Sequence, residues 1–131
     1  MKQILLSLIS CALAWSSLAA TSIDCRNLPQ NPAARDYEEV RAICAADDLR
    51  ALDREIADLY NENARRFSNH PTCTRALLEN QRRWLEQRND SHLCGNKIGQ
   101  CLYQLMSERV TFLSHHINTC FDDLESFGRN D

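Results

Sequence analysis

The sequence has little of what interrupts helices, because its 131 residues include only three glycines and three prolines. Long runs of β-branched residues, which are typical of strands, are absent. We also find no internal repeat and no low-complexity segment. Since glycine and proline are the strongest local breaks in regular structure, this composition predicts an all-α fold. The length leaves room for one domain.

Several function classes lack support in the sequence. Basic residues form no stripe and the net charge is −3, so nucleic acid is not an expected partner. No serine or cysteine stands in a recognisable nucleophile context. His115 and His116 point about 100° apart on a helix, so they do not form a metal pair. His92 and Cys94 suggest zinc but lack a second close ligand pair. We therefore expect no enzyme, no metal and no cofactor.

Residues 1–19 are predicted to be a signal peptide. Lys2 gives a positive start, and the apolar run that follows ends at Leu18, too short to span a membrane. Ser17 and Ala19 are the small residues that a signal peptidase reads, which predicts a mature chain from Ala20. That chain has no membrane span and is expected in the periplasm or outside the cell.

A lipid anchor is an alternative interpretation of the same segment. Residues 8–11 resemble a lipobox, which would make Cys11 the lipidated N-terminus. The apolar run before Cys11 is very short and continues beyond it, so we favour cleavage near Ala19. Removing Lys2 leaves 14 Lys and Arg against 18 Asp and Glu, a net charge of −4. A basic protein partner suits that charge.

The spacing of apolar residues predicts one short helix and three longer ones. Asn31 as cap and Pro32 in the first turn predict a short helix that ends near Cys44. Asp47 and Asp48 are expected to cap the second helix, which residues 68–71 end. Thr72 or Thr74 is expected to cap the third helix, which reaches about residue 90. The fourth helix covers about 97–124, and 125–131 is a frayed polar tail.

Six cysteines remain in the mature chain, an even number that indicates disulfides in an exported domain. Three long helices with short connections run up, down and up. The third helix descends about 24 Å and the fourth climbs about 28 Å, at 1.5 Å per residue. We therefore expect the pairs Cys73–Cys120, Cys94–Cys101 and Cys25–Cys44. Three of these cysteines, Cys44, Cys94 and Cys101, share one end of the bundle and could pair otherwise.

The third helix carries polar residues on a face that is otherwise apolar. Its stripe at spacings of three and four is Leu77, Leu78, Gln81, Trp84, Leu85 and Arg88. A buried, hydrogen-bonded polar core explains this pattern, because the arginine fork suits pairing with a carboxylate. The members of this core are Asp53, Gln81, Trp84, Arg88 and Arg109. The alternatives are a charged catalytic pocket and a Trp84 that stacks a sugar or peptide, but arginine is unsuited to proton transfer.

Several short motifs, in this order and spacing, resemble the LprI-like lysozyme inhibitor family, small exported helical domains of bacteria. The motifs are Cys25, Ile43-Cys44, Leu49-x-x-Leu52-Asp53 with Tyr60, Gln81-Arg82-x-Trp84-Leu85-x-x-Arg88, Cys94, Cys101-Leu102 and Arg109-Val110. The sequence departs from the family at Met106, where an aromatic is usual, and Cys73 and Cys120 look like an added pair. The resemblance implies a helical domain over 24–124 and, for some members, inhibition of lysozyme.

The segment 89–100 is the expected partner-binding element. It is polar, and a bridge to Cys101 stiffens it, which lowers the ordering cost of entering an enzyme cleft. Lysozyme's cleft holds two carboxylates, so Ser91, His92 and Lys97 are the candidate contacts. The segment could instead be an ordinary helix connection, and an acidic end led by Asp122 is a rival surface. The predicted function is an exported lysozyme inhibitor; the alternative is a periplasmic structural or envelope-stress interaction protein without inhibitory activity.

Overall fold

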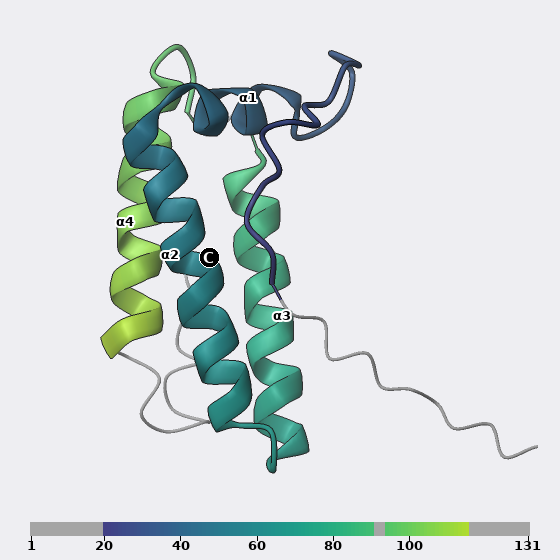
Figure 1. Ribbon diagram of the computed structural model, residues 1–131, viewed down its shortest axis with the longest axis vertical. Coiled ribbons are helices and arrows are strands. Elements are labelled where there is room, and N and C mark those ends of the chain that lie inside the picture. The colour runs from purple at the N-terminus through teal and green to yellow at the C-terminus, as the bar shows by residue number, and fades with distance from the viewer. Residues whose placement is uncertain (1–19, 91–93, 116–131) are drawn as a thin grey trace, which may run out of the picture.

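The computed structural model describes residues 20–90 and 94–115. Within these ranges the regular structure is helical throughout: α1 is Tyr37–Ala45, α2 is Asp47–Arg66, α3 is Pro71–Arg88 and α4 is Ile98–His115. The long helices α2, α3 and α4 run antiparallel in turn, and α1 lies across the end where α2 and α4 begin (Figure 1). The prediction of an all-α bundle with one short and three longer helices is confirmed.

The start of α1 lies five residues later than the sequence predicts, with Asp36 in place of Asn31 as the cap. Asn31 does not begin a helix, because its side-chain Oδ1 accepts a hydrogen bond from the backbone N–H of Ala33 at 3.0 Å. The backbone oxygen of Asn31 accepts from the N–H of Ala34 at 2.9 Å, which closes a turn. The helix begins only at Tyr37. Asparagine can form such local turns as readily as it caps helices, so the predicted start was wrong.

The expected caps of α2 and α3 also differ from the structure. Asp47 is the first residue of α2 and lies within its first turn with Asp48, where negative charge favours a helix N-terminus. The helix α3 begins at Pro71, ahead of both threonines proposed as its cap. The Thr74 hydroxyl instead donates to the backbone oxygen of Phe67 at 3.0 Å. Proline takes the first position because its missing N–H is not needed there.

The apolar core joins all four helices. It contains Ile43, Leu49, Ile56, Tyr60, Phe67, Cys73, Leu77, Trp84, Leu102, Met106, Phe112 and Leu113. The backbones of α2 and α4 run closest together, whereas α3 approaches α4 at few points and stands off from α2. Side chains of α3, together with Ala20 and Thr21, line that separation.

The N-terminal segment, residues 20–23, runs along the front of α3, beside α2, in Figure 1. The side-chain amide of Asn61 forms hydrogen bonds with both backbone polar groups of Ala20, the first residue of this segment. The N–H of Ala20 donates to Asn61 Oδ1 at 2.9 Å. In return, Asn61 Nδ2 donates to the oxygen of Ala20 at 2.8 Å. The N–H of Ile23 donates to Asp53 Oδ2 at 2.6 Å. The predicted mature chain is therefore anchored to α2 from its first residue.

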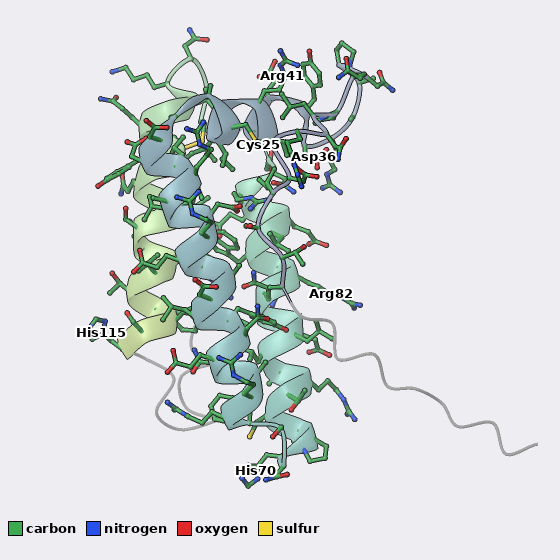
Figure 2. All side chains as sticks on the ribbon, in the orientation of Figure 1. Cys25, Asp36, Arg41, His70, Arg82 and His115 are labelled. Atoms are coloured by element: carbon green, nitrogen blue, oxygen red, sulfur yellow. A yellow bond between two sulfur atoms is a disulfide. The ribbon has the colours of Figure 1, made fainter. Side chains whose placement is uncertain are left out.

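Two disulfides lie at the end of the bundle where α1 is. Cys25 pairs with Cys44, and Cys94 pairs with Cys101. Figure 2 places Cys25 at this end and His70 at the opposite end. The Cys25–Cys44 bridge joins the chain just after the N-terminal segment to α1. The Cys94–Cys101 bridge joins the turn before α4 to the first turn of that helix. Cys120 of the third predicted pair, Cys73–Cys120, lies outside the described residues. The predicted signal peptide, 1–19, and polar tail, 125–131, lie outside them as well.

Candidate functional site

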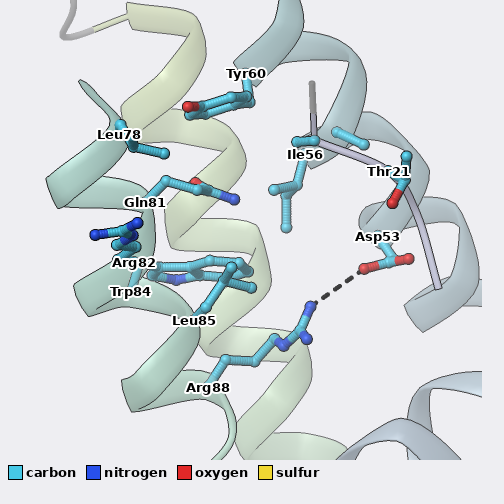
Figure 3. A pocket seen from close by; sticks show the side chains of 12 residues that line it. Thr21, Asp53, Ile56, Tyr60, Leu78, Gln81, Arg82, Trp84, Leu85 and Arg88 are labelled. Atoms are coloured by element: carbon cyan, nitrogen blue, oxygen red, sulfur yellow. Dashed lines mark hydrogen bonds and ion pairs between the residues drawn. The ribbon is translucent and has the colours of Figure 1, made fainter. Parts of the chain in front are cut away.

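An ion pair between α2 and α3 lies at the centre of the predicted polar core. Arg88 Nη1 donates to Asp53 Oδ1 at 3.3 Å, and both side chains are buried (Figure 3). The guanidinium also lies 5.5 Å from the centre of the Trp84 ring. Burial lowers the pKa of Arg88, and the nearby Asp53 carboxylate works against that change. Since Asp53 also accepts the N–H of Ile23, this carboxylate joins three separate segments of the chain.

Arg109 forms a second polar group, between α3 and α4. Its Nη1 donates to Asn80 Oδ1 and its Nη2 donates to Gln81 Oε1, both at 2.6 Å. The guanidinium lies 5.3 Å from the centre of the Trp84 ring and 5.0 Å from that of Phe112. Burial lowers its pKa to about 10, so Arg109 is a cation at neutral pH. Both of its hydrogen-bonded partners are neutral amides.

The cavity in Figure 3 separates α2 from α3 and has a volume of about 250 Å³. Asp53, Gln81, Trp84 and Arg88 line it beside apolar side chains such as Ile56. The aromatic rings of Tyr60 and Trp84 also line the cavity. The Asp53 carboxylate, which lies in the same cavity, is already paired with Arg88. A paired carboxylate and a cationic arginine offer no free general base. The Asp53–Arg88 pair joins α2 to α3 across this cavity.

Sequence reasoning missed several buried residues. Glu39 on α1 is 1% exposed, and neither of its carboxylate oxygens has a hydrogen-bond partner. Burial raises its pKa, and the neighbouring acidic residues Glu38, Asp36 and Asp90 raise it further. Asn80 and Met106 are also buried. The spacing offered a signal, because Glu39 lies four residues before Ile43, which is fully buried.

The candidate partner-binding segment, 89–100, directly follows the polar core, because Arg88 Nε donates to Asn89 Oδ1 at 3.0 Å. Its described parts are residues 89–90 and 94–100, and residues 94–97 form a turn in which the N–H of Lys97 donates to the oxygen of Cys94 at 3.3 Å. Gly95 has φ +53°, a conformation that glycine adopts without strain. Lys97 is exposed immediately before α4. Ser91 and His92, the other candidate contacts, lie outside the described residues.

The part of the chain that the structure describes contains no group of three metal-ligating side chains. Within the same residues, no helix is both long enough and apolar enough to cross a membrane.

Comparison with known proteins gives one match. The model of the family described as "Lysozyme inhibitor LprI" matches residues 31–113, which include α1, α2, α3 and most of α4. The matched range contains every predicted polar-core residue and the turn at 94–97. No curated protein and no solved structure matches the chain.

Proposed function

Because the chain belongs to the LprI lysozyme inhibitor family, we propose that it is an exported protein that binds and inhibits a lysozyme. The family match, which covers 83 residues between 31 and 113, is the observation that carries this proposal. The disulfides Cys25–Cys44 and Cys94–Cys101 add support, since such bridges persist in oxidising compartments outside the cytoplasm. The proposed location is therefore the periplasm or the medium, after cleavage near Ala19.

We propose that the turn before α4 enters the lysozyme cleft. Its disulfide closes a short loop, with a sequence separation of 7 between Cys94 and Cys101. A closed loop is ordered before it binds, which reduces the entropy lost on association. Lys97, exposed on this turn, is the sole lysine that remains once Lys2 is removed. Its ammonium would pair with the carboxylates of the lysozyme cleft, and Ser91 and His92 would flank it.

A cell-wall lysis assay with the purified mature protein and lysozymes of several types tests this function. We expect protection against at least one type. The absence of protection from every type at micromolar protein would refute inhibition and leave an envelope interaction protein as the better interpretation.

Binding kinetics test the role of the turn. We expect Lys97→Ala to raise the dissociation rate and to weaken affinity by about thirty-fold or more, because breaking a buried interfacial charge pair costs about 2 to 5 kcal/mol. Arg75→Ala is the matched control, since Arg75 is an exposed cation on α3 near the opposite end of the bundle. Equal dissociation rates for both variants would exclude the turn as the binding element.

A further inference from the structure

Arg109 is a buried cation that lacks a counter-ion among the described residues. It is 3% exposed, and its two hydrogen bonds go to the neutral side-chain amides of Asn80 and Gln81. A guanidinium has five N–H donors, and the Nε of Arg109 has no acceptor. The ion pairs in the described part of the chain involve other arginines. A buried charge without an opposite charge costs free energy, so binding a ligand that supplies a negative charge would lower that cost.

A cavity of about 430 Å³ adjoins this cation between α3 and α4. Arg109 and Trp84 both line it, and each has a buried nitrogen without an acceptor: Arg109 Nε and Trp84 Nε1. Leu105 and Phe112 give it apolar walls. Arg83, an exposed residue of α3, adds a second cation at the rim. The cavity therefore combines unsatisfied donors, positive charge and apolar surface.

We propose that this α3–α4 cavity binds a carboxylate, which accepts hydrogen bonds from Arg109 and the Trp84 indole and balances the charge of Arg109. A carboxylate on a short aliphatic stem matches two donors beside the walls formed by Leu105 and Phe112. Glu108 also lines the cavity, and it repels a doubly charged phosphate more strongly than a singly charged carboxylate. Both unsatisfied nitrogens are shielded from solvent. Arg83 and Gln87, long exposed side chains at the cavity, must therefore move aside as the ligand enters.

The single tryptophan of the mature chain reports on this cavity. The full sequence has two tryptophans, and Trp15 lies within the predicted signal peptide. Trp84 thus gives the single indole N–H signal in a proton–nitrogen correlation spectrum of the protein that begins at Ala20. We expect sodium acetate to shift this signal in a saturable way and sodium chloride at equal ionic strength to leave it in place. Equal shifts with both salts, or none with acetate, would overturn the proposal.

Two neighbouring arginines provide a matched pair of variants. Arg83→Gln removes the rim cation and should weaken acetate binding about two- to five-fold, the range expected for one exposed ion pair. Arg82 lines the α2–α3 cavity instead and points away from the bundle in Figure 2, so Arg82→Gln should leave acetate affinity unchanged. Both residues are exposed, and both variants should fold. Equal affinities for the two variants would contradict the assigned cavity.

A competition experiment identifies the source of the carboxylate. If an acidic side chain of a bound lysozyme supplies it, acetate should weaken lysozyme binding and Arg83→Gln should weaken it as well. If a free small carboxylate is the ligand, acetate should shift the Trp84 signal equally with and without lysozyme. The acetate titration does not require inhibition, so a failure of the lysis assay would refute the proposed function and leave the carboxylate site standing.

Discussion

The Asp53 carboxylate is the part of the polar core whose removal has the largest predictable effect. Asp53→Ala leaves the Arg88 guanidinium, 7% exposed, without its carboxylate. Breaking a buried pair in this way costs about 3 to 5 kcal/mol. The N–H of Ile23 loses its acceptor too, which adds about 1 kcal/mol. The sum approaches the entire free energy of unfolding of a typical small domain, about 5 to 15 kcal/mol.

Urea unfolding and thermal unfolding of the oxidised protein, both followed by circular dichroism, measure this loss. Asp58→Ala on the same helix is the matched control, because Asp58 is exposed and such surface changes stay within about 0.5 kcal/mol. We expect the melting temperature of Asp53→Ala to fall by at least about 12 °C, at roughly 4 °C or more per kcal/mol. Equal unfolding midpoints for the two variants would show that Asp53 contributes nothing to the core.

A double-mutant cycle separates the ion pair from the other bonds of Asp53. Arg88→Met removes the charge and keeps an apolar stem of similar length. Since two apolar replacements leave no unpaired charge, Asp53→Ala with Arg88→Met should be less destabilised than the two single effects added together, by about 1 to 3 kcal/mol. Strict additivity would mean that the 3.3 Å contact carries no energy, which would refute the reasoning.

Three further perturbations follow from buried or bridged groups. Burial raises the pKa of Glu39 above its ordinary 4.5, so the stability gained from its protonated form is fully present below pH 4.5 and is lost as the pH rises through the higher pKa of the folded state. The melting temperature of Glu39→Gln should therefore exceed that of the wild type at neutral pH, and identical dependences of melting temperature on pH in the two proteins would contradict this. Replacing Cys94 and Cys101 together by serine should lower the free energy of unfolding by about 2.5 kcal/mol, from the short loop that the bridge closes, as urea titration will measure. Asn61→Ala removes both bonds to Ala20 and should cost about 1 to 3 kcal/mol; unchanged proteolysis of the N-terminal segment would argue against that anchor.

The number and kind of helices could be predicted from the sequence because apolar spacing reports directly on a helical face. The helix starts could not be predicted in the same way. Asn31 is equally suited to cap a helix and to form a local turn, and the sequence around it does not decide between the two. The predicted inward residues Leu78 and Leu85 are half-buried and line the cavity between α2 and α3. They face the separation between α2 and α3, and no local pattern encodes how far apart two helices stand.

The polar core was predictable as a set of residues but not as a set of bonds. Asp53 could have met either Arg88 or Arg109, since both lie on inward faces, and only the relative height of the helices selects Arg88. Asn80 escaped notice because it lies beside Gln81, which was already assigned inward, and Glu39 lies beside the buried Val40. A face that is wider than the usual stripe buries both neighbours.

The positions of the two described disulfides have a consequence for how the protein is made. Their cysteines are close in the chain, with sequence separations of 19 and 7, and short loops close at small entropic cost. Each bridge can therefore form as soon as its own segment has crossed into an oxidising compartment, before the long helices meet. We expect these two pairings to be correct from the first oxidation, so that an oxidant suffices for them and later reshuffling by an isomerase is unnecessary.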